Sequence, residues 1–112
     1  MKMSDYTPDR WLMVKLTNKN EEVHYRVFAT WYGGYLGSDS WKLNSGVTKV
    51  TLNDGVYEFE GSSGSVYHCR NTGYGSSGYG FGVLRGLIDK SAPDLRIEEM
   101  PEETDFLTLD YK

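Results

Sequence analysis

The sequence is poor in cysteine and histidine and has no long apolar run. Its 112 residues include one cysteine, Cys69, and two histidines, His24 and His68. A single cysteine excludes an intramolecular disulfide, so a reducing cytosol is the expected environment. No stretch approaches the ~18 apolar residues of a membrane helix, and no membrane contact is expected. The start of the chain, MKMSDYTPDRW, lacks the apolar run of a signal peptide, which favours a cytoplasmic location.

The same scarcity argues against metal and thiol chemistry. Zinc sites use about four His, Cys or acidic ligands, more than this chain offers at any known spacing. His68 and Cys69 are adjacent, so on a strand their side chains point to opposite faces and cannot form a nucleophile pair. His24 and Cys69 would have to meet across a sheet. A protein without catalytic residues, metal or cofactor is therefore expected, and an enzyme using His24, His68 or Asp39 is the least favoured hypothesis.

Positive charge is also not in excess, which bears on the partners. Residues 1–90 carry ten Lys or Arg and nine Asp or Glu, whereas residues 91–112 carry two and seven. A nearly neutral body attracts phosphate weakly, so nucleic-acid binding is not expected. The acidic segment 94–112 is interpreted as a solvated end that keeps the protein soluble and can extend from the domain. It can alternatively meet a basic partner.

Alternating apolar and aromatic residues predict a mainly β fold. Leu12, Val14 and Leu16 occupy every second position, which places them on one face of a pleated strand, with Trp11 and Met13 on the other. Asp54-Gly55 marks a tight hairpin, because glycine accepts positive φ without steric cost. The sequence predicts an antiparallel meander of five strands, at residues 10–17, 22–32, 47–52, 56–61 and 65–70.

One short helix is predicted after the strands. Residues 71–80, NTGYGSSGYG, are typical of a loop, and a helix is expected from near Ser77 because apolar residues then recur at helical spacing up to Ile88. Glycines within it weaken the helix but permit a close approach to a sheet. Pro93 ends the element, residues 95–98 read as a strand, and residues 101–112 as a further strand or a tail.

These elements define the expected fold class. A chain of this length is expected to form one domain, covering residues 1–112. The class is α+β, mainly β, with an antiparallel sheet of five or more strands and one short helix packed on it.

The most unusual stretch is residues 31–47, WYGGYLGSDSWKLNSGV, which holds four glycines and four large aromatics. Tyrosine and tryptophan anchor interfaces well and also stack on planar ligands. Trp41 and Leu43 can alternatively fold back as a lid on the core, since a buried aromatic removes ~150–250 Å² from water. Both interpretations stay open. The candidate binding residues, which include two tyrosines of the 71–80 loop, are Tyr32, Tyr35, Asp39, Trp41, Asn44, Tyr74 and Tyr79.

Several segments together resemble a known group of proteins. They are Tyr6-x-Pro8-x-Arg10-Trp11, the 31–47 stretch, SGSVYHC and the following YG pairs. This pattern resembles small proteins of unknown function encoded by tailed bacteriophages, and it covers most of the chain. The resemblance implies a phage protein acting in the host bacterial cytoplasm, where such accessory proteins often bind host factors, including defence and restriction systems. It implies no activity and no residue role.

The favoured function is therefore a non-enzymatic phage accessory protein that binds and modulates a host protein. The 31–47 loop, the 71–80 loop and the acidic end are the expected contacts. The alternative is a small-ligand or nucleotide-binding protein in which the same aromatics line a pocket and Asp39 orients the ligand. A homodimer formed through an exposed strand edge is compatible with either function.

Overall fold

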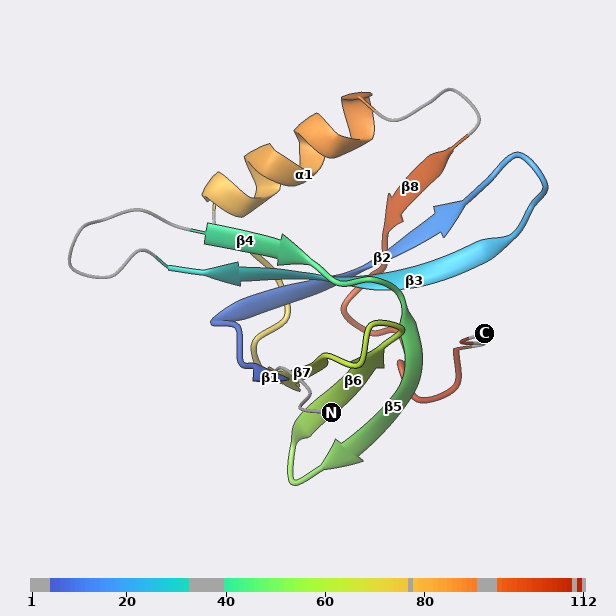
Figure 1. The fold of residues 1–112 in the computed structure, drawn as a ribbon. Helices are drawn as coiled ribbons and strands as arrows, with labels where there is room; N and C mark the ends of the chain where they lie inside the picture. The colour runs from blue at the N-terminus through green and yellow to red at the C-terminus, as the bar shows by residue number, and fades with distance from the viewer. Residues whose placement is uncertain (1–4, 33–39, 77, 91–94, 110, 112) are drawn as a thin grey trace.

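The computed structural model describes residues 5–32, 40–76, 78–90, 95–109 and 111, without the side chain of Tyr79. Its elements confirm the predicted fold class, which is α+β, mainly β, with one short helix (Figure 1). In chain order they are β1 (Asp5–Tyr6), β2 (Arg10–Thr17), β3 (Val23–Trp31), β4 (Ser40–Leu43), β5 (Val47–Asn53), β6 (Val56–Gly61), β7 (Val66–Arg70), α1 (Gly78–Lys90) and β8 (Arg96–Glu99).

The strands form two sheets of four, which corrects the expectation of one sheet of five or more. We call β4-β3-β2-β8 the central sheet and β1-β7-β6-β5 the outer sheet. All pairs within them are antiparallel except β1 with β7, which is parallel. The predicted hairpins β2–β3 and β5–β6 are both present, but they belong to different sheets.

The division into two sheets has a local cause at residues 44–46. The N–H of Asn44 still donates to the carbonyl of Val27 on β3. Gly46 has a φ of +125°, and its carbonyl already accepts from the N–H of Ser62, which follows β6. The chain therefore passes from the central to the outer sheet within three residues, a change of direction that glycine permits.

The central sheet is a middle layer with apolar contacts on both faces. Leu12, Val14 and Leu16 of β2 pack on the α1 side, whereas Trp11 and Met13 pack toward the outer sheet. Figure 1 shows α1 over one face of the central sheet and β5, β6 and β7 beyond the other. The alternation of side chains along a strand explains this two-sided burial. The fold is thus a helix, a sheet and a second sheet in three layers.

Aromatic rings fill the space between the two sheets. Trp11 is 1 % exposed, and its ring centroid lies 4.7–5.7 Å from those of four other aromatic residues. Rings of this size dominate core energetics, and their edge-to-face contacts add to the burial. The four residues are Tyr57, Phe59, Tyr74 and Phe106.

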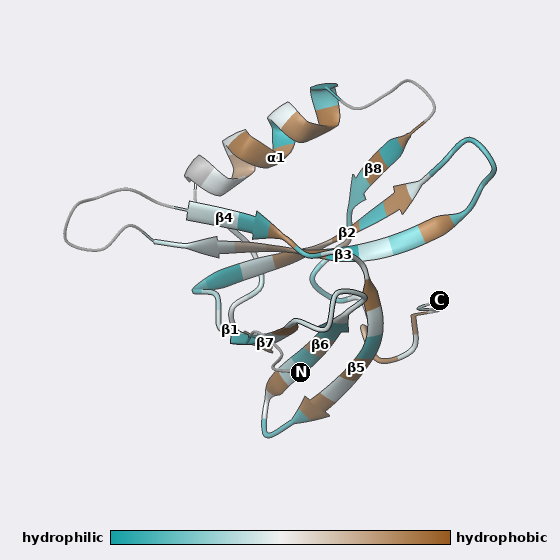
Figure 2. Ribbon diagram, in the orientation of Figure 1, coloured by the Kyte–Doolittle hydropathy of each residue, from teal (hydrophilic) through white to brown (hydrophobic). Residues whose placement is uncertain are grey.

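The helix lies close to the sheet at one glycine only. At Gly80 a Cβ atom would stand 3.0 Å from Oγ1 of Thr30 and 1.8 Å from Oγ of Ser76. At Gly82 and Gly86 a Cβ would meet nothing within 4 Å. The expected close approach is therefore confirmed at Gly80. Figure 2 shows hydrophobic residues recurring along α1, as its packing on the central sheet requires.

The described part of the acidic end is attached to the domain through β8 and Phe106. The predicted strand at residues 95–98 is confirmed as β8, which pairs with β2. Phe106 is 2 % exposed in the aromatic core, while the acidic side chains from Glu98 to Asp105 are exposed. Among the described residues after Met100 there is no strand. Within the part of the chain that the structure describes, no helix has the length and apolarity needed to cross a membrane.

Candidate functional site

The predicted binding residues divide into three groups. Tyr35, Asp39 and the side chain of Tyr79 lie outside the described residues. Asn44 and Tyr74 are engaged in contacts inside the protein. Tyr32 and Trp41 are 49 % and 38 % exposed. Among the described candidates, only this last pair has a large exposed aromatic surface that a partner can contact.

Asn44 holds the corner between the two sheets. It is 3 % exposed, and its Oδ1 accepts from the N–H of Val27 at 2.9 Å and from that of Gly46 at 3.3 Å. A buried backbone donor needs such a partner. The Oδ1 atom therefore has a structural role, whereas Nδ2 is buried without a hydrogen-bond partner among the described residues. That Asn44 contacts a ligand stays a prediction.

Tyr74 links β2 to the segment that follows β8. Its hydroxyl accepts from the N–H of Met13 at 3.1 Å and donates to the carbonyl of Met100. Its ring meets that of Trp11 edge-on at 4.7 Å. Burial raises the pKa of Tyr74 to about 12, because the phenolate would be poorly solvated there. Tyr74 is thus part of the core.

Trp41 is both a cover for the core and an exposed surface. It pairs with Thr30 across β4 and β3, and its ring stacks on that of Phe28 with centroids 5.7 Å apart and an angle of 22°. Phe28 is fully buried, while Trp41 keeps 38 % exposure. The lid and the recognition surface that the sequence left open are therefore compatible in this one residue.

Tyr32 follows β3, next to the place where β4 pairs with it. Its backbone N–H donates to the Oδ2 of Asp9 at 2.8 Å. The neighbouring Trp31 donates from Nε1 to the carbonyl of Thr7 at 3.0 Å. These bonds hold the end of β3 in place, so the exposed tyrosine stands on an anchored strand end. We call Tyr32 and Trp41 the aromatic pair.

The histidines and the cysteine form no catalytic pair in the described structure. His24 is exposed on β3 of the central sheet, whereas Cys69 is fully buried on β7 of the outer sheet. His68 lies on the exterior, 3.7 Å from carboxylate oxygens of Asp5 and Glu58. Burial raises the pKa of the Cys69 thiol, so the thiolate needed for attack is disfavoured. Among the described residues no three His, Cys or acidic side chains gather as a metal site.

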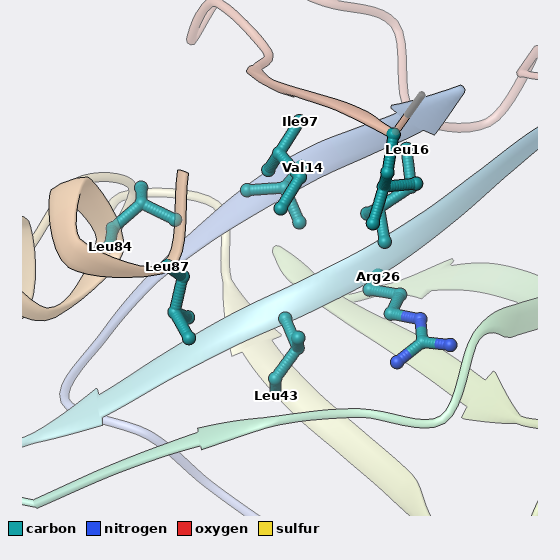
Figure 3. A pocket seen from close by; sticks show the side chains of 8 residues that line it. Val14, Leu16, Arg26, Leu43, Leu84, Leu87 and Ile97 are labelled. Atoms are coloured by element: carbon teal, nitrogen blue, oxygen red, sulfur yellow. The ribbon is translucent and has the colours of Figure 1, made fainter. Parts of the chain in front are cut away.

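A cleft between α1 and the central sheet is a feature that the sequence analysis missed. It has a volume of 310 Å³, and of the described residues that line it one is charged, Arg26 (Figure 3). The other lining residues are aliphatic: Val14, Leu16, Leu43, Leu84, Leu87, Leu95 and Ile97. The available signal for the cleft was Arg26, a charged residue within β3. Its neighbour on the same face of the strand, Phe28, is buried.

Comparisons with known proteins add no assignment. No family model, no curated protein and no solved structure matches this chain. The fold and the exposed side chains define a small, β-rich, three-layered protein with an aromatic pair on one sheet edge and an apolar cleft under its helix.

Proposed function

We propose that this chain is a non-enzymatic accessory protein, of the phage type that its sequence resembles, which binds a host protein and alters its activity. The observation that carries the proposal is the aromatic pair. Tyr32 and Trp41 are 49 % and 38 % exposed and lie at neighbouring ends of β3 and β4. Tyrosine and tryptophan are the residue types most often found as energetic anchors of interfaces.

The pair is also held in place before any partner arrives. Stacking on Phe28 restricts the ring of Trp41, and the hydrogen bond to Asp9 fixes the backbone of Tyr32. Ordering a side chain at an interface costs about 0.5–1.5 kcal/mol. The ring of Trp41, which is already restricted, avoids part of that cost, which supports its use as an anchor.

The strand beside the pair offers a second means of attachment. β4 is an edge strand of the central sheet. Edge strands present backbone N–H and C=O groups that an incoming extended segment can pair with. A partner strand added to β4 would lie against Trp41. The same geometry would allow two copies of this chain to pair. The mass of the complex distinguishes such a homodimer from a complex with another protein.

The small-ligand alternative at the 31–47 loop has less support from the described residues. Asn44 is one of its expected polar contacts, but its Oδ1 already accepts hydrogen bonds from the backbone N–H groups of Val27 and Gly46. Tyr35 and Asp39 lie outside the described residues. The protein-binding proposal depends on neither.

The proposal is tested by capture from bacterial lysate with the tagged wild-type chain and three variants. Tyr32→Ala and Trp41→Ala remove the aromatic pair one residue at a time. Leu52→Ala is the matched control, because Leu52 is 43 % exposed but lies on β5 of the outer sheet. We expect one host protein, identified by mass spectrometry, to be retained by wild type and Leu52→Ala and lost from both aromatic variants. Retention by a folded Tyr32→Ala/Trp41→Ala double variant would contradict the proposal.

A further inference from the structure

The cleft under α1 is lined by Leu84 and Leu87 of the helix. Leu84, at the middle of α1, is 3 % exposed, whereas Leu87 is only partly buried and Ile88 is 37 % exposed. The helix therefore covers the sheet tightly at Leu84 and less so one turn later. Figure 3 shows Leu84 and Leu87 extending from α1 at the left, with Val14 and Leu43 across the space from them. The result is an aliphatic cleft of 310 Å³.

Among the described residues that line this cleft, Arg26 is the one that carries a charge. Its register partner on β2 is Val14, which places it on the face of the sheet that carries the cleft. Its Nε is buried, and within the described residues Nε has no hydrogen-bond partner and Arg26 joins no ion pair. A buried charged donor without a partner is costly, and such groups call for an explanation. The charge of the guanidinium has no carboxylate partner among the described residues, and an anion at this end of the side chain would supply one.

A second, polar hollow adjoins the same arginine. It has a volume of 210 Å³ and is lined by backbone and side chains of the corner that joins the two sheets. Arg26 lines both spaces, so an apolar compartment and a polar one meet at a cation. The lining residues of the polar hollow are His24, Arg26, Ser45, Gly46, Val47, Thr48 and Ser62.

We propose that the α1 cleft binds a free aliphatic carboxylate, with its chain among the leucines and its carboxylate on the guanidinium of Arg26. Arginine presents a planar fork of donors that matches a carboxylate. A cleft of 310 Å³ holds about ten groups of roughly 30 Å³, the volume of one water molecule in the liquid. That size corresponds to a medium-chain acid such as octanoate. This site is separate from the aromatic pair and does not depend on the proposed host-protein binding.

The test is a calorimetric titration of the full chain with sodium octanoate, together with methyl NMR spectra. We expect octanoate to bind and to shift the methyl signals of Leu84, Leu87 and Ile97. Arg26→Gln should weaken binding by about ten- to a hundredfold, the range for a hydrogen bond to a charged group. Arg85→Gln makes the same change of charge on an exposed residue of α1 outside the cleft lining, and it should leave the affinity unchanged.

A neutral ligand separates charge recognition from simple apolar partition. In the wild-type chain 1-octanol should bind about ten- to a hundredfold more weakly than octanoate, because it cannot pair with the guanidinium. This comparison stands even if Arg26→Gln fails to fold. Absence of octanoate binding, equal affinity for octanol, or an unchanged affinity in folded Arg26→Gln would each overturn the proposal. Binding to anionic phospholipid vesicles without binding to free octanoate would overturn it as well.

Discussion

The ring of Trp41 stacks on the ring of Phe28 with centroids 5.7 Å apart, and only Trp41 reaches solvent. One face of the indole covers the hydrophobic cluster under α1, and part of its remaining surface is exposed. A residue in this position contributes to stability and can also contact a partner. Experiment can separate the contribution to stability from the contribution to binding, because Phe28, the buried ring of the stack, can be changed independently of Trp41.

Trp41→Ala should destabilise the fold modestly. An aromatic pair contributes ~0.5–1.5 kcal/mol beyond the area that it buries, and Trp41 is already 38 % exposed. Phe28→Ala, by contrast, creates a cavity at a fully buried position and should cost ~3–5 kcal/mol. Urea denaturation of both variants measures the difference. Equal losses of unfolding free energy would show that Trp41 is a core residue and little else.

Two helix glycines should respond in opposite directions to alanine. Gly82→Ala places a methyl group in open space, so the higher helix propensity of alanine should stabilise the protein by up to ~1 kcal/mol. Gly80→Ala forces a Cβ onto Ser76 and against Thr30, and it disturbs the 2.8 Å hydrogen bond between their hydroxyls. It should be destabilising. Melting temperatures of the two variants check this, and a stabilised Gly80→Ala would refute the described contact between α1 and β3.

Asn44→Ala should loosen the corner between the sheets. The change removes the acceptor for the buried N–H of Val27, and an unsatisfied buried donor costs about 1–3 kcal/mol. Asn53→Ala is the matched control, because Asn53 is exposed at the end of β5. Chemical denaturation should show a loss for Asn44→Ala and little change for Asn53→Ala. Similar small effects from both would mean that the Asn44 side chain does not hold the corner.

Stability should fall at alkaline pH because buried tyrosines resist ionisation. Burial raises the pKa of Tyr67 and of Tyr74 to about 12, whereas an unfolded tyrosine titrates near ~10. Both groups stay protonated in the folded protein while the unfolded chain loses protons, which favours unfolding. The full stability is therefore present below about pH 10 and declines toward pH 12. Urea denaturation across this window measures it, and a constant free energy of unfolding would be the opposite result.

The local elements of this fold were predictable because their signals are local. The β5–β6 hairpin follows from Asp54-Gly55, whose φ values are 57° and 80°. The helix follows from the spacing of its apolar residues. The partition into two sheets was not predicted, since alternation shows which face is buried but not which strand lies beside it. A signal was present in the sequence of β2, where Trp11 to Val14 form an unbroken apolar run, as expected for a strand covered on both faces; all four are buried.

The site was predictable only in part, for a related reason. The exposure of Tyr32 and Trp41 agrees with their choice as anchors, but Asn44 looked no different in the sequence from a ligand-binding amide. Whether such a side chain bonds to backbone or to a ligand is decided by its tertiary neighbours. Arg26 was missed because a strand arginine usually reaches solvent, and its position under α1 depends on the register of β2 and β3.

The most direct measurement is the dissociation constant between the captured host protein, once purified, and three forms of this chain. Trp41→Ala should weaken binding by roughly thirtyfold or more, the effect of losing an anchor of at least ~2 kcal/mol. Leu52→Ala should bind like wild type. Circular dichroism confirms that each variant is folded. An unchanged dissociation constant for a folded Trp41→Ala would contradict the account, because the exposed indole would then play no part in recognition.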